Sequence, residues 1–297
     1  MPATEPSVVS PSDVVGLTAL MALSAGSPDI SAALVDGPFT ADHPDLATEN
    51  IESLLPGRGL ATVSREGATD HGTFVAGMLM ARRGSGAPAI CPGCRLLVRP
   101  VFLAPRSDSS ELPFATPEET ADAIAECVDA GARVINLSLG LARPSLSRER
   151  RLEEALNHAA SRSAIVVAAA GNQGTLGGSA ITRHPWVVPV VACDSRGWPL
   201  ATSNLSGSSS RRGLMAPGAA VESLGTGGQP SVASGTSVAA PFVTGAIALL
   251  WSVFPDASAT EIKSAVTRPD VRRASVVPPL LDAWAAYQLM YNRRLQV

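Results

Sequence analysis

The chain lacks the charge pattern of a protein that binds nucleic acid. Its formal net charge is −3, and aromatic residues make up only 4% of the sequence. No run of lysines and arginines carries interleaved aromatic residues, and Lys263 is the single lysine. We therefore expect no nucleic acid partner.

The sequence also lacks a membrane or secretion signal. No stretch reaches the roughly eighteen apolar residues of a membrane span, which predicts no membrane partner. Residues 14–25 are apolar enough for the core of a secretory signal, but no basic residue precedes them and the first arginine is Arg58. Because a secretory signal needs a positively charged start, we interpret this segment as a folded helix at about residues 12–25.

Apolar strand-like and helix-like segments alternate along the chain, with no internal repeat. Hydrophobic residues make up 45% of the sequence, which is enough for a large core. The alternation predicts an α/β fold with a parallel sheet covered by helices on both faces. We expect strands near residues 30–36, 95–102, 133–139, 164–170 and 187–192, and helices near residues 70–82, 117–130, 149–161, 237–253 and 258–266.

One serine stands at the start of a long apolar segment. Ser237 precedes residues 238–254, which are mostly apolar and predict a buried helix. The free N–H groups and the positive dipole end of the first turn favour negative charge that develops at this serine. Serine or threonine before an apolar helix is usually only a cap, so other residues must decide whether Ser237 is a nucleophile.

A histidine and an aspartate occur in motifs that suit such a serine. His71 lies in the opening turn of a second predicted apolar helix, whereas His43, His158 and His184 lie in contexts that look structural. Asp36 closes an apolar strand, and open α/β sheets place their chemistry at the carboxyl ends of strands, although acids there are often turn residues. An aspartate can hold a histidine in the tautomer that accepts a serine proton, and the serine can then attack a carbonyl.

Another buried strand ends in Gly171 and Asn172. On its own, the pair Gly-Asn is typical of a turn. In acyl transfer, however, an amide that donates to the developing oxyanion contributes about 3 to 4 kcal/mol. An asparagine at the end of this strand therefore has a mechanistic use.

The order of these motifs resembles that of the subtilisin-like serine peptidase family, the subtilases. The matching stretches are Leu34-Val35-Asp36-Gly37, His71-Gly72-Thr73 with Val75-Ala76-Gly77, Ala169-Ala170-Gly171-Asn172, and Gly235-Thr236-Ser237 with Ala239 and Pro241. The resemblance implies a three-layer subtilisin-like fold with a core at about residues 28–265. We expect a single peptidase domain over residues 1–297, and a C-terminal helix at about residues 279–293 that packs on it or docks a partner protein.

The resemblance also implies a role for each motif. It makes Ser237 the nucleophile, His71 the general base and then acid, Asp36 the carboxylate that orients the histidine, and Asn172 the oxyanion donor. Its substrate-binding residues are Ser138, Leu139 and Gly140, which pair with the peptide backbone, and Ala169, Ala170 and Gly171, which wall the first specificity pocket. Main-chain pairing accepts an extended peptide of any sequence. Two loops, residues 104–116 and 176–182, are expected to frame the groove.

The opening of the chain resembles a subgroup, the subtilase domains of cyanobactin-type peptide-modification pathways. The matching residues are Gly16, Leu17, Leu20, Gly26, Ile30, Val35-Asp36-Gly37-Pro38 and Asp42-His43-Pro44. Only 35 residues precede Asp36, which leaves no room for the inhibitory propeptide of secreted subtilases. The resemblance implies a cytoplasmic serine endopeptidase that removes the leader from a ribosomally synthesised, modified precursor peptide.

Two other functions stay open. A macrocyclase would let the substrate's own amine intercept the acyl-enzyme, but cyclising relatives carry an extra helical insertion, and the segment between His71 and Ser138 is of ordinary length. A catalytically silent scaffold would bind peptides in the same groove. Such a scaffold has no need of Asp36, His71, Asn172 and Ser237 together.

A calcium site is not expected near the first strand. Asp45 matches a position that often binds calcium in the family. The loop that supplies the other ligands contains Arg82 and Arg83 here, and two arginines repel a cation.

The cysteines give a second, weaker metal signal. Cys91 and Cys94 have the spacing of a zinc half-site or a redox pair, but Cys127 and Cys193 stand alone. We expect free thiols, with a local disulfide as the less favoured alternative. The sequence therefore predicts no metal and no other cofactor.

Overall fold

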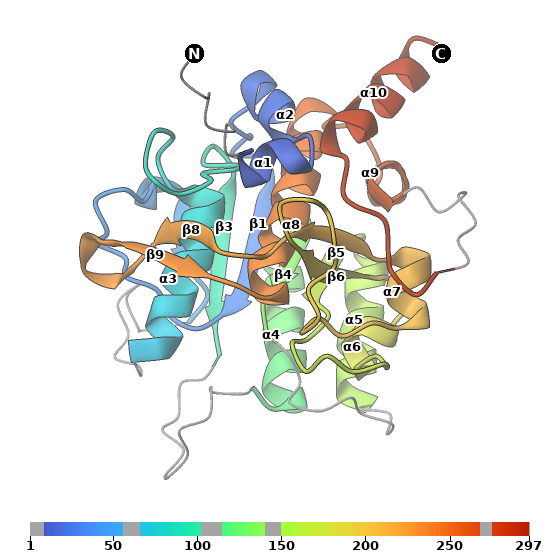
Figure 1. The fold of residues 1–297 in the computed structure, drawn as a ribbon, viewed down its shortest axis with the longest axis horizontal. Coiled ribbons are helices and arrows are strands. Elements are labelled where there is room, and N and C mark those ends of the chain that lie inside the picture. Colours follow the sequence, from blue (N-terminus) through green and yellow to red (C-terminus); the bar gives the residue numbers. More distant parts are fainter. Residues whose placement is uncertain (1–8, 56–65, 102–114, 140–149, 268–274, 297) are drawn as a thin grey trace, which may run out of the picture.

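The structure is a computed structural model that describes residues 9–55, 66–101, 115–139, 150–267 and 275–296. Its centre is a seven-stranded sheet in the order β2-β3-β1-β4-β5-β6-β7, in which every neighbouring pair is parallel (Figure 1). The strands are β1 Ser31–Asp36, β2 Ile51–Ser53, β3 Arg95–Pro100, β4 Val134–Leu137, β5 Ile165–Ala169, β6 Val187–Cys193 and β7 Leu214–Pro217. All of the carboxyl ends therefore lie at one edge of the sheet.

Different helices cover the two faces of the sheet. The helices are α1 Pro11–Val14, α2 Leu17–Leu23, α3 Glu66–Met80, α4 Pro117–Asp129, α5 Arg150–Ser161, α6 Ala180–Arg183, α7 Gly207–Arg212, α8 Thr236–Val253, α9 Ala259–Thr267 and α10 Ala283–Arg294. Ala32 and Leu34 of β1 join the hydrophobic cluster that contains α3 and α8, and Ala33 and Val35 join the cluster that contains α4 and α5. The predicted three-layer α/β fold is confirmed.

The predicted helix at residues 12–25 is wrong in its continuity. The structure has two short helices there, α1 and α2, separated by Gly16 in a left-handed conformation with φ of 64°. A side chain at Gly16 would lie 3.1 Å from both the backbone nitrogen of Trp284 and Oδ1 of Asp282, at the start of α10. The chain therefore breaks where it must pass close to its own C-terminal helix, a contact that helical spacing does not reveal.

Other element boundaries also differ from the prediction. Helix α3 begins at Glu66, so His71 lies in its second turn and not in the opening turn that the sequence predicted. Helix α10 begins at Ala283, because Asp282 caps it through a 2.8 Å bond from the N–H of Ala285. The sequence analysis missed β2, β7, α6 and α7, and a separate antiparallel hairpin, β8 Val221–Leu224 with β9 Pro230–Ala233, which packs on α3 through Gly77.

Helix α8 runs through the middle of the molecule. Over 18 residues its mean hydropathy is 1.6, so by length and composition it could cross a membrane, and our expectation that no apolar stretch was long enough is wrong. Within the protein, 83% of the helix is buried against β4, β5, β6, β7 and α3. Its hydrophobicity is that of a central core helix.

Gly245 of α8 is a test of how tightly this core is packed. A Cβ at Gly245 would lie 2.4 Å from Cγ2 of Ile90, which is itself buried. We predict that Gly245→Ala lowers the free energy of unfolding by about 1 to 3 kcal/mol, measured by urea denaturation. In a protein that already carries Ile90→Ala, Gly245→Ala should lower the free energy of unfolding by less, so the effects of the two substitutions are not additive. A Gly245→Ala variant more stable by about 0.5 to 1 kcal/mol, as in an open helix, would contradict this packing.

Candidate active site

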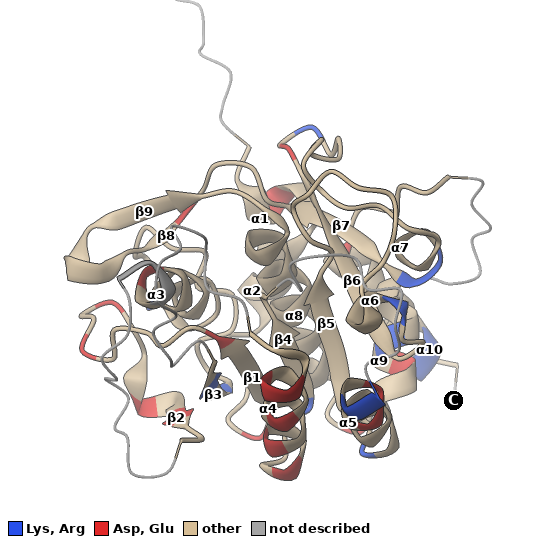
Figure 2. Cartoon of the chain, turned by 90° about the horizontal axis from the view of Figure 1, so that it is seen from below, with Lys and Arg blue, Asp and Glu red and all other residues tan. Residues whose placement is uncertain are grey.

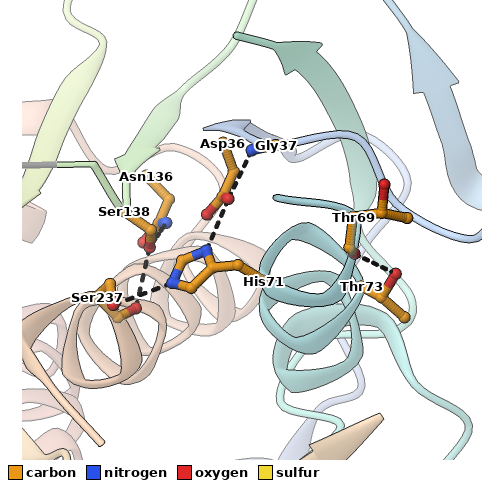
Figure 3. A network of polar contacts seen from close by, with 8 residues as sticks. All are labelled: Asp36, Gly37, Thr69, His71, Thr73, Asn136, Ser138 and Ser237. Carbon is orange, nitrogen blue, oxygen red and sulfur yellow. Dashed lines mark hydrogen bonds and ion pairs between the residues drawn. The ribbon is translucent and has the colours of Figure 1, made fainter. Parts of the chain in front are cut away.

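Three of the predicted residues meet at the carboxyl edge of the sheet. Asp36 is the last residue of β1, His71 projects from α3, and Ser237 lies in the first turn of α8 (Figure 3). Nδ1 of His71 lies 2.7 Å from Oδ1 of Asp36, and Nε2 of His71 lies 3.0 Å from Oγ of Ser237. The imidazole therefore bridges an acid and a hydroxyl.

The hydrogen bonds assign the histidine tautomer. The Asp36 carboxylate is 1% exposed, and its Oδ1 also accepts a 2.6 Å bond from the N–H of Gly37. Because this carboxylate only accepts, Nδ1 of His71 carries the proton and Nε2 is free to accept one from Ser237. This tautomer is the one that a general base requires.

Gly72 lets the histidine reach the aspartate. A Cβ at Gly72 would lie 2.1 Å from the carbonyl oxygen of Pro38 and 2.5 Å from that of Gly37. No side chain fits into that space, so the backbone of α3 touches the segment that follows β1. The contact holds His71 next to Asp36.

Two opposing effects act on the pKa of His71. Burial lowers it, and the charge of Asp36 together with the hydrogen bond to Asp36 raises it, with a net increase above the ordinary value of 6.5. The side chain of His71 keeps 33% of its exposure, which limits the desolvation, and the partner carboxylate is buried beside it. Burial is the largest single effect on the pKa, but the charge of Asp36 and the hydrogen bond to Asp36 together outweigh it.

A chain of buried hydrogen bonds ends at the backbone of Ser237. Pro241 has no N–H, so the carbonyl of Ser237, four residues earlier, receives no helical hydrogen bond from it. Instead Oγ of Ser138 donates to this carbonyl at 3.0 Å, and Nδ2 of Asn136 donates to Oγ of Ser138 at 2.6 Å (Figure 3). Thr244 completes the chain by donating to Oδ1 of Asn136 at 2.8 Å. This chain connects β4 to the turn that carries the nucleophile candidate.

The Asn172 side chain is oriented by the residue before Ser237. Its Oδ1 accepts from the backbone N–H of Thr236 at 2.9 Å and from the Thr236 hydroxyl at 3.1 Å. The same hydroxyl accepts a 3.1 Å bond from the N–H of Gly171. With its oxygen held, Asn172 leaves the Nδ2 amide free of any partner among the described residues and available to a ligand.

The predicted substrate-binding residues lie at the ends of two neighbouring strands. Ser138 and Leu139 follow β4, Ala169 ends β5, and Ala170 and Gly171 follow it; all of them are buried. Gly140 lies outside the described residues. Their contacts with substrate stay predictions.

The sequence analysis did not identify Asn136, Thr244 or Thr236 as parts of the site. Asn136 had a signal, because it is the one polar residue in the otherwise apolar run of β4. Thr244 had none, since a threonine inside a long apolar helix has many uses. Thr236 orients the Asn172 side chain through a hydrogen bond between residues that are 64 positions apart, which the sequence does not reveal.

The cysteines are free and buried. The hydrogen bond with Cys94 and burial raise the pKa of the Cys91 thiol, and burial raises the pKa of Cys127 and of Cys193 to about 12. Zinc binds thiolates, so these thiols are poor ligands. In the part of the chain that the structure describes, no group of three His, Cys, Asp or Glu side chains could hold a metal ion.

Comparison with known families gives one family over most of the chain. A model of the subtilase family matches residues 27–274. Subtilisin amylosacchariticus from Bacillus subtilis subsp. amylosacchariticus is 29% identical over 229 residues, which are 76% of this chain and 56% of the relative. The chain thus spans little more than half the length of this curated relative.

Solved structures show the same fold. The protease domain of PatA has a TM-score of 0.81 and 29% identity, covering 90% of this chain and 97% of that domain. The prenylagaramide maturation protease PagA has a TM-score of 0.79 and 27% identity, covering 92% and 98%. The PatG macrocyclase in complex with peptide is similar in fold alone, with a TM-score of 0.79 and 18% identity over 97% and 100% of the two chains.

The His71 titration tests the assignment of its partner. We predict that in an NMR pH titration the His71 ring titrates above pH 6.5, and that Asp36→Asn moves its midpoint below 6.5, because burial then acts alone. His184 serves as the internal control, since its pKa is lowered chiefly by burial and Asp36 does not contribute to it. An unchanged His71 midpoint in Asp36→Asn would show that the carboxylate does not determine its protonation.

Proposed function

Since the chain belongs to the subtilase family, we propose that it is a serine endopeptidase that cleaves peptide bonds through an acyl-enzyme on Ser237. The observation that carries this proposal is the continuous hydrogen-bonded line from Asp36 through His71 to Ser237. This arrangement, with the acid buried and the hydroxyl at a helix N-terminus, supports a catalytic triad.

The proposed reaction has two halves, formation of the acyl-enzyme on Ser237 and its hydrolysis, and the same side chains act in both. Oγ of Ser237 attacks the peptide carbonyl while Nε2 of His71 takes its proton, and Asp36 stabilises the imidazolium that forms. Nδ2 of Asn172 donates to the oxyanion of the tetrahedral intermediate. His71 then gives the proton to the leaving amine, and a water, deprotonated by the same nitrogen, releases the peptide acid from Ser237.

The raised pKa of His71 gives this reaction an acidic limit. The base must be neutral to accept the serine proton. Activity is therefore expected to fall as the pH drops through a value above 6.5 and to persist at higher pH.

We propose a precursor peptide as the substrate, and leader removal as the reaction. PatA and PagA, the latter named as a maturation protease, each align over at least 90% of this chain. An extended leader would pair with Ser138 to Gly140, and its side chain before the cleaved bond would lie against Ala169 to Gly171. A cytoplasmic location for such an enzyme stays a prediction.

Hydrolysis is favoured over the two alternatives. Between β3 and β4 the described residues hold one helix, α4, and the likeness to the PatG macrocyclase is too distant in sequence to carry an activity. A silent scaffold would gain nothing from a histidine held in the tautomer of a general base.

The first test is covalent labelling of the serine. We predict that a fluorophosphonate probe adds once to the purified protein, seen by intact mass, and does not add to Ser237→Ala. Asn172→Ala should slow labelling by about 10²–10³-fold, a magnitude already known from removal of an oxyanion donor in a subtilisin, because the probe also develops charge on an oxygen. Fast labelling of Ser237→Ala would place the reactive group elsewhere.

The second test separates hydrolysis from cyclisation. We predict that a library of linear peptides incubated in water enriched in ¹⁸O gives linear products that carry the isotope at the new carboxyl end. The label enters because water, and not a peptide amine, attacks the acyl-enzyme on Ser237. An unlabelled product lighter by one water than the linear acid of the same residues would instead show macrocyclisation, and unchanged peptides would contradict the peptidase proposal.

A further inference from the structure

A pocket of about 500 Å³ is lined by residues other than Asp36, His71 and Ser237. That volume is within the range of ligand pockets. Two of the segments that line it are the loop after Asn172 and the helix α7. Its lining includes Leu176, Gly178, Arg183, Ser206, Arg211 and Arg212. We call it the arginine pocket, after its three arginines.

No acid in the described part of the chain neutralises the three arginines. Arg183 donates to the carbonyl of Gly178, Arg211 to that of Gly207, and Arg212 to those of Thr182, Arg183 and His184. Carbonyl oxygens orient a guanidinium but carry no net charge. None of the three arginines forms an ion pair with any described residue, and the pocket lining contains no acid.

Elsewhere in the described chain, arginines commonly pair with acids. Arg95 pairs with Glu52, and Arg99 pairs with Glu126 at 2.6 Å. Figure 2 shows acidic residues along α4 and at β2, and basic residues on α6 and α7. The arginine pocket therefore brings together three arginines that pair with no described acid.

A fourth cation lies next to the pocket. Burial and the charge of Arg212 lower the pKa of Lys263 to about 8, and burial and the charge of Arg211 lower the pKa of Arg212. Cations this close repel each other unless an anion joins them. The positive charge gathered around the pocket lining favours an anionic ligand.

The remaining lining favours a peptide over a lone inorganic anion. Leu176 is 80% exposed and Val276 is 47% exposed, and Ser206 and Ser208 also line the pocket. Among the described residues that line the pocket, none is an aromatic residue on which a nucleic acid base could stack. Apolar contacts next to guanidinium groups suit a segment with both aliphatic and carboxylate side chains.

The pocket is within reach of a peptide bound at the active site. Leu176 follows Asn172 by four residues, so their Cα atoms are at most about 14 Å apart. The backbone N–H of Asn204 donates to the carbonyl of Gly171 at 2.9 Å, and Ser206 is only two residues further on. An extended peptide covers about 14 Å with four residues.

We propose that the arginine pocket binds an acidic segment of the polypeptide substrate, about four to six residues from the bond that is cleaved. This assignment rests on the proposed peptidase function. The arginine pocket would select for substrate sequence, whereas the main-chain pairing near Ser237 accepts any extended peptide. Asp or Glu side chains would form charge-assisted hydrogen bonds with Arg183 and Arg211, the two exposed arginines of the pocket.

The test measures binding without cleavage. In the Ser237→Ala background, a fluorescein-labelled peptide of alternating Glu and Leu should bind with an affinity that falls as salt is added. Adding Arg183→Gln and Arg211→Gln together should weaken it by on the order of tenfold, whereas Arg162→Gln should not. Arg162 is also an exposed arginine, but it precedes β5 and so lies at the opposite edge of the sheet.

The controls separate this proposal from the peptidase itself. Arg212 is left in place because it holds three carbonyls, and equal thermal unfolding of the variants confirms that they fold. A matching Gln and Leu peptide should bind weakly to all of them. Equal binding of the acidic peptide to the double arginine variant, or tighter binding of a short single-stranded RNA than of the peptide, would overturn the assignment. Fluorophosphonate labelling of Ser237 should be the same with and without the two arginine substitutions, so that either proposal can fail alone.

Discussion

The closeness of α3 to the end of β1 is the contact on which the site depends. The backbone at Gly72 touches the carbonyls of Gly37 and Pro38, and any Cβ there would overlap both. The contact sets the distance between an aspartate that belongs to the sheet and a histidine that belongs to a helix. The burial of apolar faces holds the layers together, but this single approach sets the 2.7 Å bond between His71 and Asp36.

The nucleophile candidate is held from the other side by a different device. Pro241 leaves the carbonyl of Ser237 without its helical donor, and the hydroxyl of Ser138 supplies one from β4. The carbonyl that lacks a helical donor thus accepts a hydrogen bond from Ser138, which joins the end of β4 to the first turn of α8. Because Asn136 and Thr244 are buried, the loss of either would leave a polar group without a partner in the core.

Much of this arrangement could be predicted from the sequence. Apolar runs that end in Asp36 or in Gly171 and Asn172 predict strands with chemistry at their carboxyl ends, and an apolar helix after Ser237 predicts the position of the serine. The features that were missed depend on residues distant in the chain. Gly16 breaks the N-terminal helix because α10 passes beside it, and the start of α3 at Glu66 and the hairpin of β8 and β9 have no periodicity strong enough to predict them.

The burial of all four cysteines has a practical consequence for work on this protein. Each thiol lies inside the core, and although the hydrogen bond with Cys91 lowers the pKa of Cys94, burial keeps thiol reagents away from all four. A single cysteine introduced at a surface position would then be the one exposed thiol in the molecule. Fluorophores, spin labels or cross-linkers can be attached there without first rebuilding the interior.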